Sequence, residues 1–248
     1  PLHIQRPYPA VFQGLLGGQD LPALAEALEQ QGQYVQAFFE RKPCESHGLL
    51  RDFYEGGSVV LNRVDKVWAP VGRLCVALRE RLHHVFGVMY LTPRGSQAVR
   101  AHTDDQDVFV LQLAGCKHWR IYDTPLALPF EHEQLGKSSP LTSESLGEPR
   151  MEVRLQAGEL LYLPRGVPHE ARADPGASSL HLTLTVQTPE QLVERALPSM
   201  RLRGLRPLPR TPERRVSRLE AEPWPPELGS GRPQSTRTSR LPLAGRAR

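Results

Sequence analysis

The sequence predicts a mainly β fold with flanking helices, in which short strands form a sandwich or a barrel. Over residues 88–187, short apolar or alternating segments are separated at close intervals by Gly, Pro and Asp. This spacing is typical of antiparallel sandwiches and barrels rather than of βαβ units. Clear helical periodicity lies instead in the preceding residues 1–87.

Residues 1–87 are expected to form α/β elements that flank the barrel. One helix is predicted over 20–31, where Asp20 would cap the first turn, apolar residues recur on one stripe and Gly32 would end the helix. A second helix is predicted over 71–84, because leucine recurs there at every fourth residue. Between them, residues 58–61 indicate a short strand.

Residues 88–187 are expected to form the barrel core. Strands are predicted over 88–91, 108–113, 118–122, 151–155, 159–163 and 180–186, and residues 126–148 are loop-like in composition. The last strand alternates strictly, with aliphatic residues on one face and His181, Thr183 and Thr185 on the other. Such a strand fits a barrel wall around a polar ligand, although a surface strand with its polar face in water has the same pattern.

The end of the chain has a different composition. Residues 188–204 offer a short helix at 189–198, and residues 205–248 are rich in Pro, Arg, Ser and Gly. Few large apolar side chains occur in the latter, so we expect a disordered tail. As a flexible cation, this tail could contact RNA weakly.

Charge and composition limit the classes of function. The net charge is +4, but twelve Arg, no Lys and four Glu lie from residue 201 onward, a net of +8, so residues 1–200 carry −4. Charge therefore gives no support for a nucleic-acid-binding core. No apolar run is long enough to span a membrane. Three scattered cysteines, Cys44, Cys75 and Cys116, argue for a reducing compartment and against a disulfide framework or a Cys-rich zinc site.

A metal site is indicated by His102, Asp104 and His169. The spacing of His102 and Asp104 puts both side chains on one face of an extended segment, and His169 follows a Pro-Arg-Gly turn. Two histidines and a carboxylate bind iron(II) on one face and leave the other face open for a cosubstrate and oxygen. Asp105 and Asp107 are alternative ligands, although Asp105 would face away from His102 on a regular strand. Taken alone, His169 would more commonly lie at the surface or behind the ligands.

Lys117 is a candidate anchor for the cosubstrate. It lies at the start of the strand predicted at 118–122, thirteen residues beyond Asp104. A cation inside the barrel would bind the distal carboxylate of a dicarboxylate such as 2-oxoglutarate. A solvated lysine at a strand edge is the alternative.

Five ordered blocks of the sequence resemble the JmjC ribosomal oxygenases. The blocks are YLTPRGSQ (90–97), HTDDQDVFVLQL (102–113), GCKHWR (115–120), GELLYLPRGVPH (158–169) and SLHLTLT (179–185). The resemblance is dense over about 87–187 and looser upstream, at FFERKP (38–43). It implies a double-stranded β-helix of the cupin, or jelly-roll, superfamily.

The resemblance also implies roles for single residues. The iron ligands would be His102, Asp104 and His169, the 2-oxoglutarate anchor would be Lys117, and His181 and Thr185 would line the same cavity. Tyr90 would lie on the substrate side. The implied reaction converts 2-oxoglutarate to succinate and CO2 and hydroxylates a His or Arg side chain of a ribosomal protein with O2.

Two departures from the family pattern affect these expectations. Val88 stands where the family has an Asn two residues before the Tyr of the first block, so cosubstrate affinity or target choice is expected to differ. The helical dimerisation region and winged helix of the family have no counterpart after residue 187, which leaves dimerisation open. An intracellular location is expected, cytoplasmic in a bacterium or nuclear and nucleolar in a eukaryote.

Three other functions use the same residues. A histone lysine demethylase would hydroxylate an N-methyl group and release formaldehyde, acting on a histone tail. A metal-binding cupin without turnover would serve recognition only. A zinc hydrolase would need a nearby general base, for which only Asp105 and Asp107 are close in sequence.

Overall fold

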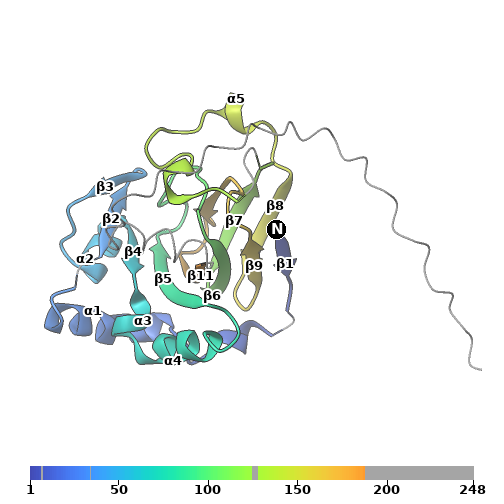
Figure 1. The fold of residues 1–248 in the computed structure, drawn as a ribbon. Coiled ribbons are helices and arrows are strands. Elements are labelled where there is room, and N and C mark those ends of the chain that lie inside the picture. The colour runs from blue at the N-terminus through green and yellow to red at the C-terminus, as the bar shows by residue number, and fades with distance from the viewer. Residues whose placement is uncertain (7, 34, 125–127, 188–248) are drawn as a thin grey trace, which may run out of the picture. The chain divides into compact units, whose positions relative to one another are not determined.

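The protein is built mainly from antiparallel strands, which form two sheets (Figure 1). The computed structural model describes residues 1–187 except 7, 34 and 125–127. The larger sheet has eight strands in the order β1-β9-β6-β11-β5-β4-β2-β3, and the smaller has three in the order β10-β7-β8. The strands are β1 Leu2–Ile4, β2 Gln36–Phe39, β3 Lys42–Cys44, β4 Ser58–Asn62, β5 His84–Thr92, β6 Asp107–Ala114, β7 Cys116–Ile121, β8 Met151–Gln156, β9 Leu160–Leu163, β10 His169–Ala173 and β11 Ser179–Gln187.

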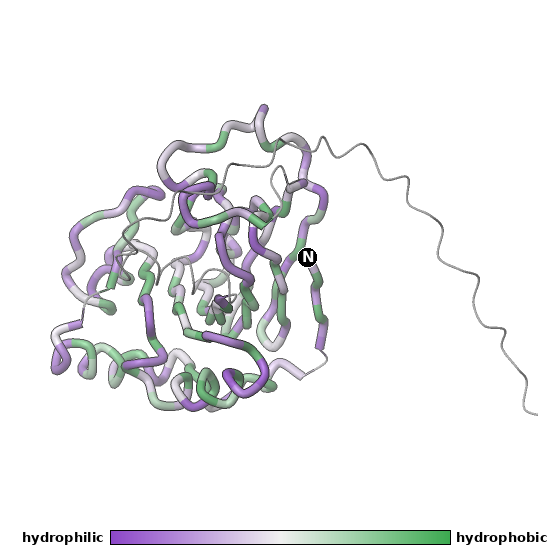
Figure 2. The backbone as a smooth tube through the Cα atoms, in the orientation of Figure 1, coloured by the Kyte–Doolittle hydropathy of each residue, from purple (hydrophilic) through white to green (hydrophobic). Residues whose placement is uncertain are grey.

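Helices from the first part of the chain cover one face of the larger sheet (Figure 1). The helices are α1 Leu21–Gln30, α2 Leu49–Tyr54, α3 Val64–Val67, α4 Ala69–Leu78 and α5 Ser143–Leu146. Leu24 of α1 and Val71 of α4 pack in one core cluster with Met89 of β5 and Leu182 of β11. Apolar and polar residues alternate along many of these elements (Figure 2), as expected where only one face is buried.

The other face of the larger sheet packs on the smaller sheet. A second core cluster joins Val110 of β6 and Leu161 of β9 to Trp119 of β7 and Leu155 of β8. Two facing antiparallel sheets with their own core are consistent with the predicted jelly roll. The predicted fold class is therefore confirmed.

Strand β11 lies in the middle of the larger sheet and pairs with β5 on one side and β6 on the other. Both of its faces are buried: Leu182 packs toward the helices, while His181 is 2% exposed and faces the interior. The surface-strand interpretation of this segment is thus excluded. The alternation of the sequence marked the wall of an internal cavity.

The structure differs from the predicted helices at two places. The helix predicted over 71–84 is α4, which begins at Ala69 and ends at Leu78, and His84 is already the first residue of β5. Asp20 precedes α1, but its carboxylate accepts a hydrogen bond from the Gly17 N–H (2.7 Å) and does not cap the helix. Asp20 closes the short 3₁₀ turn before the helix instead.

The segment predicted as a loop, residues 126–148, contains little regular structure where it is described. It holds a 3₁₀ turn at Glu131–Glu133 and the single turn of α5. The helix predicted at 189–198 and the tail predicted at 205–248 lie outside the described residues. Among the described residues, no helix has the length and hydrophobicity that crossing a membrane requires.

Candidate metal centre and cosubstrate cavity

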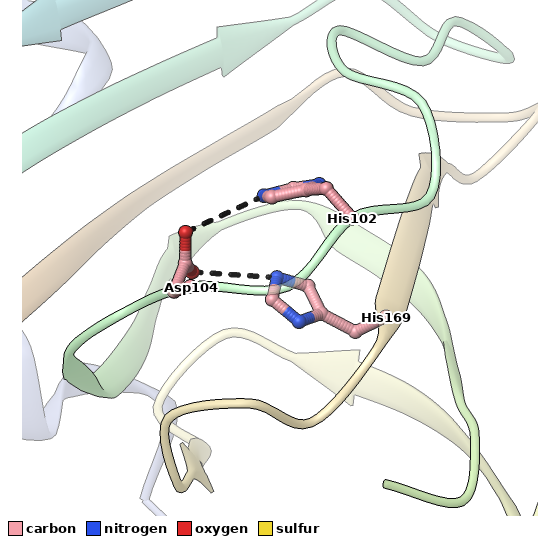
Figure 3. Close-up of side chains that lie close together, drawn as sticks. All are labelled: His102, Asp104 and His169. Carbon is pink, nitrogen blue, oxygen red and sulfur yellow. Dashed lines mark ion pairs between the residues drawn. The ribbon is translucent and has the colours of Figure 1, made fainter. Parts of the chain in front are cut away.

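The structure brings His102, Asp104 and His169 together (Figure 3). The distance from His102 Nε2 to Asp104 Oδ1 is 3.7 Å, and that from His169 Nε2 to Asp104 Oδ2 is 3.6 Å. Metal bonds of about 2.0–2.2 Å require neighbouring ligand atoms to be about 3 to 4 Å apart. These two separations fit a shared ion.

Backbone hydrogen bonds hold the three residues in register. His102 and His169 form an isolated β-bridge, in which each N–H donates to the other's carbonyl (3.1 and 2.9 Å). The Gly166 N–H donates to the carbonyl of Asp104 (2.8 Å). Residues 67 and 62 positions apart in the sequence are thereby tied directly to one another, before any metal is considered.

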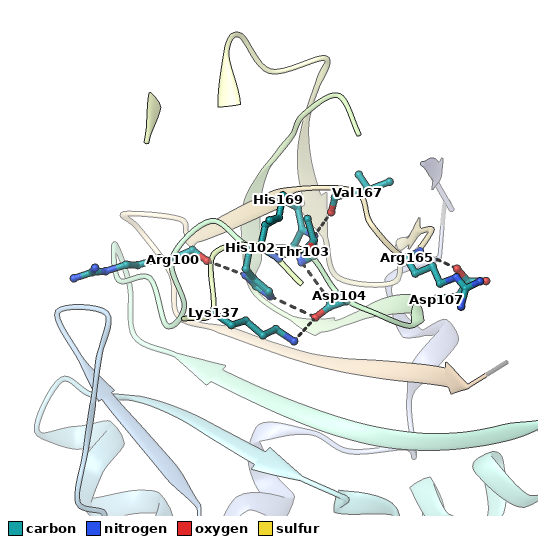
Figure 4. Close-up of polar contacts among 10 residues, drawn as sticks. Arg100, His102, Thr103, Asp104, Asp107, Lys137, Arg165, Val167 and His169 are labelled. Carbon is teal, nitrogen blue, oxygen red and sulfur yellow. Dashed lines mark hydrogen bonds and ion pairs between the residues drawn. The ribbon is translucent and has the colours of Figure 1, made fainter. Parts of the chain in front are cut away.

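The second ring nitrogen of each histidine is also fixed. His102 Nδ1 lies 2.8 Å from the carbonyl of Arg100, and His169 Nδ1 lies 2.9 Å from the carbonyl of Val167 (Figure 4). A carbonyl can only accept, so each Nδ1 carries the proton and each Nε2 presents its lone pair toward Asp104. This is the arrangement in which histidines bind metals, and the residues present therefore fit a divalent ion.

The charge state of the cluster suits a cation. Burial by itself raises the pKa of Asp104, but His102, His169 and Lys137 together lower it to about 2. Burial, and secondarily His102, lowers the pKa of His169 to about 4. Near neutral pH the cluster thus offers a carboxylate and a neutral His169, which are the forms that bind metals.

The alternative ligands Asp105 and Asp107 do not join this cluster. Asp107 accepts a hydrogen bond from the Arg165 N–H through Oδ1 (2.9 Å), so it holds the turn before His169. Asp105 is buried (7% exposed) outside the described metal-ligating group.

Part of the 126–148 segment docks on the metal cluster. The Leu135 N–H donates to Thr103 Oγ1 (2.8 Å), and the Thr103 N–H donates to the Leu135 carbonyl (3.0 Å). Gly136 has a φ of +82° and lies so close to His102 that a Cβ there would be 2.7 Å from His102 Cα. This docking brings Lys137 Nζ to 3.1 Å from Asp104 Oδ1 (Figure 4).

A cavity extends from the metal cluster into the space between the sheets. The enclosed volume is small, about 50 Å³, and the cavity is partly open to solvent. Its walls come from both sheets and include Tyr90, Val108, Val110, Lys117, Trp119, His181 and Thr183, together with the three cluster residues.

Lys117 points into this cavity and is buried (2% exposed). Its Nζ donates to Thr92 Oγ1 (3.1 Å) and lies 5.7 Å from the centre of the Tyr90 ring. Among the described residues, no carboxylate pairs with it, and burial lowers its pKa from 10.5 to about 7. A buried cation without a counter-ion fits an anionic ligand in the cavity.

His181 and Tyr90 lie on adjacent strands and stack, with ring centres 4.7 Å apart and planes 8° from parallel. Burial, and secondarily Lys117, lowers the pKa of His181 well below its usual value, so this ring is neutral. His181 Nδ1 and Trp119 Nε1 are buried polar atoms without a partner in the described structure. Both belong to walls of the cavity, where a polar ligand could satisfy them.

Thr185 is buried, but among the described residues Thr183 and not Thr185 lines the cavity. Thr92 and Trp119 were not predicted as site residues. Each lies two residues from a residue that was selected, Tyr90 or Lys117, on the same face of a strand. Strand alternation was therefore the signal that could have found them.

The fold and the side chains define a jelly roll with a candidate His-Asp-His metal centre and a cationic cavity. Within that class, the chain belongs to the JmjC domain family, whose profile matches residues 66–193.

Comparison with individual proteins agrees with this assignment. Ribosomal oxygenase 1 of Gallus gallus is 36% identical over 200 residues, which cover 75% of this chain and 32% of that protein. The bifunctional lysine-specific demethylase and histidyl-hydroxylase NO66 of Culex quinquefasciatus is 42% identical over 138 residues, 54% of this chain and 21% of that protein. The chain thus spans about a third or less of the length of these relatives.

Among solved structures, the ribosomal oxygenase YcfD of Escherichia coli, in complex with cobalt and 2-oxoglutarate, has the same fold. The TM-score is 0.55 at 19% identity, and the match covers 90% of this chain and 59% of YcfD. At this identity the likeness concerns the fold alone.

Proposed function

We propose that this chain is an iron(II)- and 2-oxoglutarate-dependent dioxygenase that hydroxylates a protein side chain, a His or Arg of a ribosomal protein. One observation carries the proposal: the His102, Asp104 and His169 cluster and the unpaired ammonium of Lys117 line the same cavity. A metal site alone would suit many functions. A metal site that shares its cavity with a buried cation suits a metal-chelating dicarboxylate.

Each group has a role in this proposal. Nε2 of the two histidines and a carboxylate oxygen of Asp104 would hold the iron. Lys117, oriented by Thr92 Oγ1 (3.1 Å), would hold the distal carboxylate of 2-oxoglutarate. Bound iron supplies the activation of O2, coupled to conversion of 2-oxoglutarate to succinate and CO2.

The remaining walls position the cosubstrate and exclude water. The stacked rings of Tyr90 and His181 form a rigid side wall, and His181 Nδ1 and Trp119 Nε1 are free to bond a polar ligand. Val108 and Val110 of β6, the neighbour of β11 in the same sheet, make the adjacent part of this wall apolar. Tyr90 is assigned to the substrate side and His181 to the cosubstrate, while Thr183 takes the place first expected for Thr185.

The names of the relatives support the substrate class. They include a ribosomal oxygenase and histidyl-hydroxylases. A small acidic metabolite is a less suitable substrate, because among the described residues the cavity has one unpaired cation, Lys117, and 2-oxoglutarate would occupy it.

Succinate formation tests the reaction. The full chain with iron(II), ascorbate and 2-oxoglutarate is expected to release succinate, and His102→Ala is expected to lose both this activity and bound metal. His83→Ala, at an exposed histidine far from the cluster in sequence, is the matched control and should retain both. Absence of turnover in the wild type, together with unchanged metal content in His102→Ala, would contradict the proposal.

Mass spectrometry tests the substrate. Ribosomal proteins from cells with and without this gene should differ by one oxygen atom, about +16 Da, on a His or Arg side chain. Turnover of 2-oxoglutarate without any such difference would retain the reaction type and reject the substrate.

Lysine demethylation is a second candidate, because the relatives named NO66 are described as lysine-specific demethylases as well. The same centre would hydroxylate an N-methyl group, and the product would lose formaldehyde. Formaldehyde release from methylated histone peptides at a rate matching succinate formation would favour this candidate over hydroxylation.

A further inference from the structure

A basic groove lies beside the metal cluster, between the β2–β3 hairpin and the segment 95–100. Four cations line it, Arg41, Lys42, Arg100 and Arg172, against one acid, Glu40. Residues 1–200 carry a net charge of −4, so the composition does not account for this concentration of positive charge.

The four charges are not neutralised within the described structure. Among the described ion pairs, none involves Arg41, Lys42, Arg100 or Arg172. Arg172 Nε donates to the Gly95 carbonyl (2.7 Å), which orients its guanidinium without cancelling its charge. Four like charges in one groove repel one another, and an anionic partner would relieve that repulsion.

The hairpin that carries two of the cations is strained at its turn. Phe39 pairs with Lys42, so the turn consists only of Glu40 and Arg41, with φ values of +50° and +64°. Such turns are normally formed by Asn-Gly, since side chains are disfavoured at positive φ. Strain of this kind persists mainly where a side chain serves a function, and here it places Arg41 in the groove.

Residues of the groove contact residues that line the metal cavity. The carbonyl of Arg100 holds His102 Nδ1, while the Arg100 side chain points away from the three ligands (Figure 4). Gln97 lines the groove and donates through Nε2 to Glu170 of the cavity wall (3.2 Å). A ligand in the groove would therefore lie next to a substrate entering the cavity.

We propose that the basic groove binds single-stranded RNA through its phosphates. Phe38 and Phe39 line the groove together with the cations, and cations interleaved with aromatic rings are typical of single-strand nucleic-acid sites. Guanidinium groups also match phosphate oxygens in two-point contacts. The inference goes beyond the proposed function: the RNA of a ribonucleoprotein would dock beside the reactive cavity.

Fluorescence anisotropy with a labelled oligouridylate of about 12 nucleotides tests the groove in the full chain. The double variant Arg41→Glu, Lys42→Glu is expected to lose about tenfold or more in affinity and to flatten the salt dependence by about 1 to 2 in log–log slope. The matched control Arg73→Glu, Arg81→Glu changes two exposed cations outside the groove and keeps the basic tail. Equal losses in both double variants would overturn the proposal.

A second variant separates binding from folding. Glu40→Asn, Arg41→Gly relieves the strained turn, so it should melt at a higher temperature while binding the oligonucleotide more weakly. A higher melting temperature with unchanged affinity would exclude a role for Arg41.

Cross-linking identifies the partner and its location. RNA containing 4-thiouridine should cross-link to peptides around residues 38–42, and cross-links confined to residues after 200 would assign all binding to the tail. If polyglutamate displaces the labelled RNA as effectively as unlabelled RNA does, the partner is an acidic peptide and RNA is rejected. Competition by a DNA oligomer tests whether the ribose is recognised. These measurements need neither metal nor 2-oxoglutarate, so their failure leaves the proposed catalysis intact.

Discussion

Replacing Lys117 by methionine is expected to stabilise the fold while abolishing 2-oxoglutarate binding. Burial lowers the pKa of Lys117 from 10.5 to about 7, and each pKa unit corresponds to about 1.4 kcal/mol. The pKa of Lys117 is lower in the folded state, so its burial destabilises the fold most at low pH. This cost is about 4 to 5 kcal/mol below pH 7 and falls to about 2 kcal/mol at pH 9. Loss of the hydrogen bond to Thr92 destabilises the variant by about 1 kcal/mol. The free energy of unfolding of the variant at pH 7 should therefore exceed that of the wild type by about 3 kcal/mol.

Denaturant unfolding of both proteins at pH 6, 7.5 and 9, without cosubstrate, measures this difference. Calorimetry with 2-oxoglutarate measures the loss of binding. Lys66→Met, at an exposed lysine, is the matched control and should change neither quantity. A Lys117→Met variant that is less stable than the wild type at pH 7, or a stability difference that does not decline toward pH 9, would refute the premise that this ammonium is buried without a counter-ion.

The remaining predictions concern the same cavity. Binding an anion raises the pKa of Lys117 again, so 2-oxoglutarate affinity should be constant below pH 7 and fall up to about tenfold per pH unit above it; Lys117→Arg should flatten this profile in calorimetry. Lys137→Met removes a cation 3.1 Å from Asp104 and should raise Mn²⁺ affinity up to about fivefold in a metal titration, and a lower affinity would contradict competition between the two cations. Gly136→Ala should push the docked segment off His102, seen as faster proteolysis of residues 128–148; unchanged proteolysis would show that the segment is not held there.

Strand alternation predicted the part of the fold that forms the cavity. The strict pattern of β11 was visible in the sequence, and the structure places its polar face inside and its aliphatic face on the helices. Alternation works here because each face of a strand meets one environment along its whole length. Because residues two positions apart share a face of a strand, alternation also predicts that Trp119 shares the face of Lys117 and that Thr92 shares the face of Tyr90.

Features set by distant contacts escaped prediction. The short strand β1 exists because it pairs with β9, more than 150 residues away. The β2–β3 hairpin has Glu40 and Arg41 at its turn, where a sequence rule expects Asn and Gly. Lys137 reaches Asp104 only because its segment docks on Thr103, and no spacing in the sequence encodes that contact.

The net charge of residues 1–200 did not predict the basic groove, because this sum contains no information on which charges lie together in the fold. A sum over residues gives every charge the same weight, whereas the potential at a surface depends on which charges are paired. Arg120 illustrates the difference, because Glu152 neutralises it at 2.9 Å, while Arg41 and Arg172 have no such partner among the described residues. Within the part of the chain that the structure describes, the groove cations and Lys117 have no ion-pair partner, which is unfavourable, and a bound anion would relieve this at each site. Among these described residues, positive charge without an ion-pair partner thus lines both the metal cavity, at Lys117, and the open basic groove.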